Sequence, residues 1–306
     1  MFQDNSHVTR VQKPSLHPTS IKSGTKIHDY LKIWELQRNR SYVAHISMQF
    51  EFYFLNSVNN RQPPRLSNGL AFRISSTHEI LKTQTCLQYP NSVPGDGRPN
   101  DIIVTIPAYN IASLLFPSYE SSVDHLCHIL HIPTLWSLMK NFYLRISQSE
   151  SVLPGQGALL LSILAIAAHF YQPFNNSEVA TTKPDAIDLS KILSRGALTV
   201  LDFSRRNTLG TLEDVQATIL MSFVAYHIDG LSARGRILLT SAVSIARELH
   251  LHRLDADNEL SVPENETGLR RSIDREVKRR VFWHIASTDW FVVEPGVKPT
   301  HCLHLC

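Results

Sequence analysis

Histidine and cysteine side chains gather at one point of the chain, where their spacing could hold a metal ion. They are His125, Cys127, His128 and His131. The i, i+3 spacing of His125 and His128 places both on one face of a helix. Imidazole and thiolate are ligands that suit Zn²⁺. The residues between them, Leu126, Ile129 and Leu130, are apolar, as on an amphipathic helix with its histidines outside. We favour this second interpretation and predict no metal site here.

A second set of suitable ligand types lies at the end of the chain, in residues 301–306 (His-Cys-Leu-His-Leu-Cys). This run has no hydrophobic support, so we predict no metal or cofactor site there either. The chain has four cysteines, Cys86, Cys127, Cys302 and Cys306. Their irregular spacing does not indicate a disulfide framework, which fits a reducing compartment.

A basic run near the C-terminal end could contact phosphate groups. It consists of Arg270, Arg271, Arg275, Lys278, Arg279 and Arg280. Acidic residues are interspersed, and Glu276 and Arg280 stand at i, i+4, the spacing of an ion pair on a helix. The formal net charge of +3 is too mild to indicate a nucleic-acid surface. We therefore predict a paired helix face rather than a DNA contact.

Motifs of the common enzyme classes are absent from the sequence. There is no G-x-S-x-G elbow, no G-x-G-x-x-G, no G-x-x-x-x-G-K and no H-E-x-x-H. No spacing places a nucleophile, a base and an orienting group together. We predict no catalytic residues and expect the protein not to be an enzyme.

The composition is that of a folded protein without a membrane span. Hydrophobic residues make up 43% of the 306 residues and charged residues 19%, enough apolar side chains for one sizeable helical domain. The N-terminus does not resemble a secretory signal. The longest apolar run, residues 158–168, is shorter than the roughly 20 residues that cross a bilayer. It predicts a buried core helix instead.

The pattern divides the chain into three parts. Residues 1–105 carry repeated prolines and a turn-rich segment at 91–100, which predict an irregular or poorly ordered region. Residues 49–55 could form a strand or a short helix. Residues 106–293 show helical periodicity, and residues 294–306 form a divergent tail.

The helical part contains six segments with an apolar stripe or a cap. Thr211 and Asp214 form a capping box that opens one of them. Another is expected to begin near Asp188 as its cap. The predicted segments are 134–146, 157–171, 189–200, 215–229, 238–249 and 273–293. With no convincing β-rich run between them, the sequence predicts an all-α, multi-helix domain with an irregular N-terminal extension.

Three stretches, in this order, resemble one known family. They are residues 212–220, residues 234–253 with the ending Leu-His-Leu-His-Arg, and residues 276–290 (EVKRRVFWHIASTDW). The last has the family's acidic residue, arginine pair, aromatic pair and downstream aspartate. Together they resemble the fungal-specific transcription factor domain, the middle region of binuclear zinc-cluster regulators. The resemblance covers roughly residues 110–293 and implies that the arginine pair, Arg279 and Arg280, bridges helices.

The chain departs from the family pattern at both ends. A Zn₂Cys₆ cluster needs six thiolates, and this sequence has no Cys-x-x-Cys pair. After Trp290 the expected further helices are replaced by a short segment with Pro295 and Pro299. We therefore expect a regulatory domain without its own DNA-binding module, truncated at the C-terminus.

The resemblance implies nuclear regulation of transcription, with a metabolic or secondary-metabolite gene set as the candidate target. The expected partners are other transcription regulators or a second copy of the chain, with a small-molecule effector as a further candidate. DNA is expected to be reached only indirectly, and no membrane is involved. The alternative is a protein-interaction remnant that pairs with intact regulators and sequesters them.

The helix predicted at 273–293 carries the adjacent aromatics Phe282 and Trp283, which lie about 100 degrees apart around its axis. Bulky side chains on two sides suit a helix packed between neighbours. We therefore expect Trp283 to be buried, with the segment 238–249 as an antiparallel neighbour that offers Ala242 and Ala246.

Overall fold

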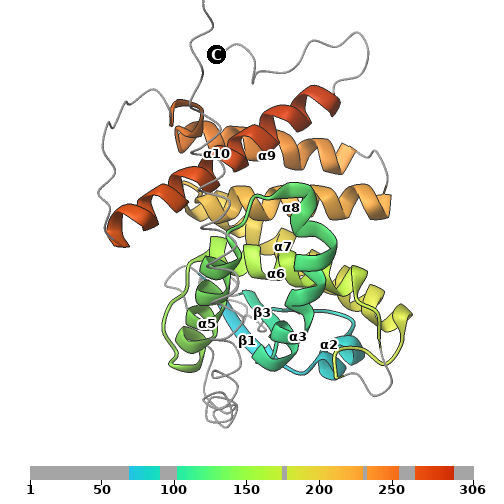
Figure 1. The fold of residues 1–306 in the computed structure, drawn as a ribbon. Helices are drawn as coiled ribbons and strands as arrows, with labels where there is room; N and C mark the ends of the chain where they lie inside the picture. Colours follow the sequence, from blue (N-terminus) through green and yellow to red (C-terminus); the bar gives the residue numbers. More distant parts are fainter. Residues whose placement is uncertain (1–68, 90–101, 174–177, 230–232, 255–265, 293–306) are drawn as a thin grey trace, which may run out of the picture.

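The computed structural model describes residues 69–89, 102–173, 178–229, 233–254 and 266–292. Fourteen elements follow in chain order. They are β1 (Leu70–Ser75), α2 (Thr77–Thr83), β2 (Leu87–Gln88), β3 (Ile102–Pro107), α3 (Tyr109–Tyr119), the π-helix η2 (Glu120–Asp124), α4 (His125–Cys127), α5 (Ile132–Ser147), α6 (Pro154–Phe170), α7 (Lys183–Asn207), α8 (Leu212–Asp229), α9 (Ala233–Glu248), the 3₁₀ helix η3 (Leu251–Arg253) and α10 (Glu266–Val292). The described part is mainly helical (Figure 1), so the predicted all-α class is confirmed, with a small sheet added to it.

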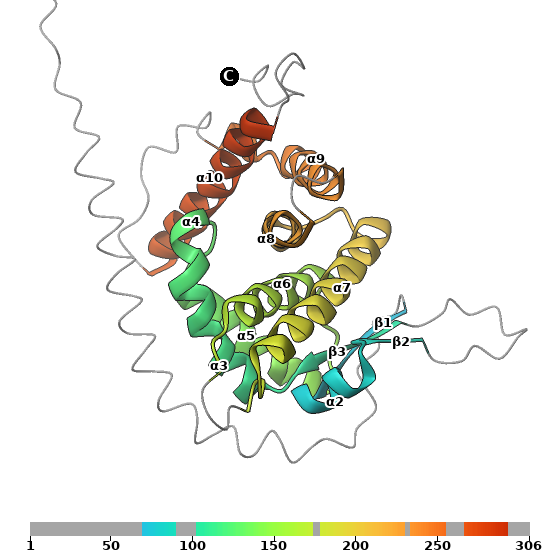
Figure 2. The same cartoon turned by 90° about the vertical axis from the view of Figure 1, so that its right-hand side faces the viewer.

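Helix α6 forms the centre of the fold. A proline at its start favours helix initiation, and from Gly157 to Ala168 every side chain is buried. A helix that is apolar on all sides must be covered on all sides. Figure 2 shows α3, α5, α7 and α8 around it. The core helix predicted from the apolar run is confirmed.

A three-stranded sheet packs against one side of this helical core. The strand order is β1-β3-β2, with β1 parallel and β2 antiparallel to β3. Phe72 of β1 is fully buried, and its ring contacts that of Phe142 in α5 at a centroid distance of 5.2 Å. Within residues 1–105, which were expected to be irregular, residues 69–89 and 102–105 instead form two strands, a helix and part of a third strand that pack on this core.

Two helix glycines leave room for side chains that come from the sheet and the segment before β2. A Cβ atom added at Gly157 in α6 would lie 2.3 Å from Cζ of Phe72, and one added at Gly196 in α7 would lie 2.6 Å from Sγ of Cys86. Carbon atoms normally approach no closer than about 3.5 Å. Both helices thus need glycine where the sheet residues meet them.

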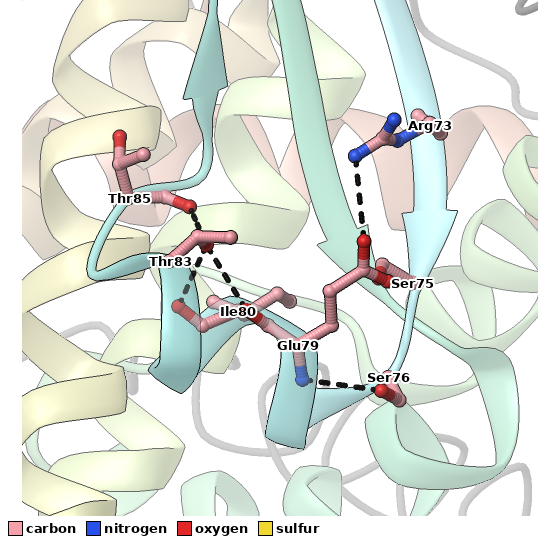
Figure 3. A network of polar contacts seen from close by, with 7 residues as sticks. All are labelled: Arg73, Ser75, Ser76, Glu79, Ile80, Thr83 and Thr85. Atoms are coloured by element: carbon pink, nitrogen blue, oxygen red, sulfur yellow. Dashed lines mark hydrogen bonds and ion pairs between the residues drawn. The ribbon is translucent and has the colours of Figure 1, made fainter.

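Figure 3 shows the polar contacts that join β1 to α2. Ser76 caps the helix, since its hydroxyl accepts a hydrogen bond from the backbone N–H of Glu79 at 3.2 Å. The Glu79 carboxylate in turn accepts a bond from the Ser75 hydroxyl and lies 3.9 Å from the Arg73 guanidinium. These contacts fix the tight turn between strand and helix.

The helices predicted beyond residue 134 are all present, with changed limits. The helix expected from 189 begins instead at Lys183, because Thr182 and Asp185 form a capping box before it. Asp188 is therefore not its cap. Among the described residues from 134 to 290 there is no strand.

Helix α8 packs on α6, and α9 and α10 lie beyond it, farthest from the sheet (Figure 1). Helix α9 packs on α8 through buried small and apolar residues, including Ala242 and Ala246, and α10 contacts both helices. In Figure 1, α9 and α10 cross each other while running in opposite senses. The predicted neighbourhood of these two helices is confirmed.

Candidate functional site

A cavity of about 620 Å³ lies between α5, α6, α8 and α10. Its size falls within the usual range of small-molecule pockets, ~300–1,000 Å³. Buried side chains form its inner wall: Leu130, His131, Leu135, Leu159, Gln216 and Val277. The exposed side chains of Arg270 and Asp274 stand at its rim. The buried wall is therefore mainly apolar and carries no charge, while the half-buried carboxylate of Glu213 and the exposed charged groups of Arg270 and Asp274 complete the lining.

A reversal of the chain brings Leu130 and His131 into this wall. Helix α3 continues through the π-helix η2 into α4, which ends at His128 in the left-handed conformation (φ 47°). The chain then turns inward, so that Ile129 and Leu130 are buried, and α5 starts with a proline in its first turn. Turning the chain at His128 thus places His131 directly before α5, in the cavity wall.

The imidazole of His131 is held in place by its neighbour Thr134. Its Nδ1 atom lies 2.6 Å from the Thr134 hydroxyl oxygen. Burial, with the Arg280 guanidinium nearby, lowers the pKa of His131 to about 4. The ring is consequently neutral at pH 7 and can take part in hydrogen bonds without bringing charge into the wall.

The start of α8 supplies the other polar residue of the wall. The Asp214 carboxylate accepts a bond from the Thr211 backbone N–H at 2.8 Å, while the Thr211 hydroxyl accepts one from the Asp214 backbone N–H at 3.3 Å. This is the predicted capping box. One turn later, Gln216 donates from Nε2 to the carbonyl of Ile129 at 2.8 Å. That bond fixes the Gln216 side chain in the wall and ties α8 to the segment before α5.

The four candidate metal ligands of the sequence are not brought together. His125 and His128 are exposed, as predicted, but His131 is buried and Leu126 is 56% exposed. The expected amphipathic pattern thus fails at Leu126, within α4, and at His131, after the chain reversal at His128. Burial and the Asp124 carboxylate raise the pKa of Cys127 to about 11, which disfavours its thiolate. Within the described ranges no three His, Cys, Asp or Glu side chains could share a metal ion. Residues 301–306 lie outside the described part.

A second cavity, of about 640 Å³, lies along α7 beside Tyr89 and Ile102. Its polar lining is exposed, and the Arg206 guanidinium is already paired with the Asp202 carboxylate at 2.5 Å. Water competes effectively for exposed charged groups. This cavity is therefore the weaker candidate of the two.

The family model for the fungal specific transcription factor domain matches residues 117–293. This chain belongs to that family. The match includes α5, α6, α8 and α10, so all four helices around the 620 Å³ cavity are part of the family domain. No solved structure matches the chain.

Several curated fungal proteins are similar to this chain. The "Probable transcription factor lepB" of Aspergillus flavus is 37% identical over 237 residues, 76% of this chain and 41% of that protein. "Transcription factor TAS2" of Pyricularia oryzae is 31% identical over 57% of this chain and 22% of its own length. The "Agnestins biosynthesis cluster transcription factor AgnL11" of Paecilomyces divaricatus is 29% identical over 61% of this chain and 27% of its own length. The chain thus spans less than half the length of each of these relatives.

The basic run that the fungal transcription factor domain carries in α10 is largely paired, as predicted. Arg279 and Arg280 both contact Glu276, at 2.5 and 2.9 Å, and Lys278 contacts Asp274 at 2.6 Å. The resemblance implied that Arg279 and Arg280 bridge helices, and their contacts to Glu276 lie within α10. A bridge to another element comes from Arg275, which donates to the carbonyl of Leu254 at the end of η3 at 2.8 Å.

The aromatic pair of α10 departs from the expectation. Trp283 is 58% exposed, so the prediction that it is buried is wrong. The inward face of α10 is formed by Val277, Val281 and Ile285, at i, i+4 and i+8. Trp283 lies about 200 degrees from Val281 around the helix and points outward. Only Phe282, which is half-buried, packs against the core.

None of the described helices combines the length and the apolar composition that a bilayer crossing requires.

Proposed function

We propose that this chain regulates transcription in the nucleus as the regulatory domain of a fungal transcription factor, with a secondary-metabolite gene set as its target. The family match over residues 117–293 is the observation that carries this proposal. The similarity to AgnL11, whose name assigns it to a biosynthesis cluster, favours the metabolic target. The helical domain acts by changing the activity of a DNA-binding module with which it is associated.

The route to DNA in this proposal is indirect. The 306 residues contain four cysteines and no Cys-x-x-Cys pair, which is too few for a Zn₂Cys₆ cluster. Three of the basic residues of α10, Lys278, Arg279 and Arg280, are engaged with carboxylates of the same helix. In this proposal DNA is contacted by a module that these 306 residues do not supply, in another transcription regulator that binds this chain or in an assembly that includes a second copy of it.

A reporter assay tests the proposal directly. The full chain is fused to a heterologous DNA-binding module in a fungal cell, and transcription from a promoter with the matching site is measured. We expect a change of at least threefold relative to the module alone, together with nuclear accumulation of the chain. An unchanged reporter with a folded, nuclear fusion protein contradicts the proposal.

The same observation on cysteines supports a second candidate function, the sequestering of intact regulators. Overexpression of the unfused chain distinguishes the two. A sequestering protein lowers transcription of the gene set, and it co-purifies with a zinc-cluster regulator, while the fusion itself has no effect on the reporter.

A further inference from the structure

The inner wall of the 620 Å³ cavity differs in chemistry from its rim. The buried members are four aliphatic side chains and two polar ones, His131 and Gln216. At pH 7 neither polar side chain is charged, since burial lowers the pKa of His131 to about 4. Arg270 and Asp274 are exposed at the rim, and the Asp274 carboxylate is paired with Lys278 at 2.6 Å. A molecule inside the cavity thus meets mainly apolar surface and two neutral hydrogen-bonding groups, with the half-buried Glu213 carboxylate also in the lining.

The two neutral polar groups are held rigidly. The Thr134 hydroxyl lies at 2.6 Å from Nδ1 of His131, and Gln216 is bound to the Ile129 carbonyl at 2.8 Å. The backbone fixes both positions. His131 lies directly before α5, and Gln216 lies in the first turns of α8, after the capping box. Pre-positioned polar groups in a mainly apolar pocket are the feature that orients small ligands.

The N-terminal half of α10 forms one side of the cavity. Leu269, Ile273 and Val277 face the cavity at i, i+4 and i+8. The buried residues Val281 and Ile285 follow on the same stripe and lie in the main core of the protein. The buried stripe of α10 thus continues into the main core at Val281 and Ile285, whereas toward the N-terminal end Leu269 and Ile273 are only half-buried and face the cavity.

We propose that this cavity binds an uncharged, mainly apolar organic molecule of about drug size that carries a hydroxyl or carbonyl group, and that its binding holds the N-terminal half of α10 against α5 and α8. The inference rests on the proposed function in one respect, since it names the effector site of the regulatory domain. The hydroxyl or carbonyl pairs with His131 or Gln216, and the apolar body fills the space between Leu135, Leu159 and Ile273. A carboxylate loses its hydration against the buried wall and also faces the half-buried Glu213 carboxylate, so anionic analogues bind more weakly.

The first experiment measures binding of Nile red, an uncharged apolar fluorophore with a carbonyl group, to the purified full chain. We expect saturable binding at one site. Leu138→Trp, which fills the cavity from α5, should weaken it at least tenfold. The matched control is Leu198→Trp, since Leu198 is also a half-buried leucine but lines the second cavity. It should change the affinity by less than twofold.

A second filling variant, Ile273→Trp, enters the same space from α10 and should weaken binding in the same way. Circular dichroism and thermal unfolding verify that each variant is folded. No saturable binding to the parent chain, or equal loss with Leu138→Trp and Leu198→Trp, overturns the assignment of the cavity. Should Leu138→Trp fail to fold, the comparison between Ile273→Trp and Leu198→Trp decides.

Two further measurements test the ligand class and the response of α10. Displacement of Nile red by 1-naphthol should need at least fivefold lower concentrations than displacement by 1-naphthoate, which carries a carboxylate. Equal potency refutes the preference for uncharged ligands. Saturating 1-naphthol should slow amide hydrogen exchange at residues 269–277 at least fivefold and leave α6 unchanged. Binding without slower exchange there refutes the link to α10.

Failure of this inference is distinguishable from failure of the proposed function. A reporter that responds to the fused chain, combined with no binding of Nile red, leaves the regulatory function intact and removes the effector site. Specific binding that Leu138→Trp abolishes, combined with a silent reporter, retains the site and removes the regulatory function.

Discussion

Substitution of Gly157 by alanine tests whether the sheet truly forms part of the core. In an isolated helix this change stabilises by roughly 0.8–1 kcal/mol, because alanine has the higher helix propensity. In this protein the new Cβ atom would lie 2.3 Å from Cζ and 2.7 Å from Cε1 of Phe72. The Phe72 ring is fully buried and packs edge-on against Phe142, so it has little room to retreat.

The expected balance follows from these opposing terms. Overpacking a tight core costs about 1–3 kcal/mol, which exceeds the gain in helix propensity. Gly157→Ala should therefore lower the free energy of unfolding by about 1 kcal/mol. In a Phe72→Leu background the distal ring atoms are gone, and the same change should raise the free energy of unfolding by about 0.8 kcal/mol. The sign of the effect thus depends on one residue of β1.

Urea unfolding of the four proteins in this cycle, followed by circular dichroism, gives the coupling between the two positions. We expect a coupling energy of about 2 kcal/mol, within the range found for residues in contact. If Gly157→Ala stabilises the parent chain, or if its effect is the same in both backgrounds, Phe72 does not pack on α6. The placement of residues 69–89 in the domain would then be refuted.

Further substitutions test the orientation of α10, the cap of α8 and the burial of His131. Trp283→Ala should alter the free energy of unfolding by less than about 0.5 kcal/mol, as for other exposed positions. Val281→Ala, at a buried position, should lower it by about 2 kcal/mol. Urea titrations that show the reverse order contradict the orientation of α10. Thr211→Ala should cost about 1 kcal/mol by removing the cap of α8, and Thr211→Ser should restore most of it. The pKa of His131 is about 4 in the folded protein and near 6.5 in the unfolded chain. The unfolded chain therefore binds this proton first, so the free energy of unfolding falls as the pH drops from about 6.5 toward 4. In His131→Gln the loss of stability between pH 7 and pH 4.5 should be smaller by about 2 kcal/mol, and an unchanged pH profile would contradict the burial of this ring.

Local signals were sufficient to predict the helical part of the fold. The apolar run at 158–168 predicts a buried helix from composition alone, and α6 is that helix. The capping box at Thr211 depends only on residues three apart and is present as predicted. The sheet could not be predicted in this way. Strand β1 pairs with β3 across about 30 residues that include a turn-rich segment, and such a long-range pairing leaves no period in either short strand.

In the candidate site, too, local sequence patterns predicted some features, while others depend on contacts between distant residues. The spacing of the histidines before residue 132 is compatible with metal ligands. Their burial depends on the chain reversal at His128, which turns His131 inward and leaves His125 exposed to solvent. The adjacency of Phe282 and Trp283 indicated two packed faces. Three aliphatic residues at i, i+4 and i+8 take the inward face instead, and Trp283 lies on the opposite side of the helix, exposed. Gln216 gave no signal in the sequence, because its role depends on a contact to Ile129, 87 positions away.

The proposed ligand response of α10 is limited by what the ligand can add to one half of one helix. A shift from 1:99 to 99:1 between two arrangements needs about 5.5 kcal/mol of differential binding. Only contacts to α10 distinguish a held N-terminal half from a released one, and these come from Leu269, Ile273 and the already buried Val277. Full burial of a leucine or isoleucine side chain contributes about 1.5–3 kcal/mol. Leu269 and Ile273 are half-buried without a ligand, so each adds about 1 kcal/mol when the cavity is filled. The sum of about 2 kcal/mol lies within the usual range of allosteric coupling and corresponds to a shift of roughly thirtyfold. A ligand in this cavity should therefore grade the activity of the domain rather than switch it fully on or off.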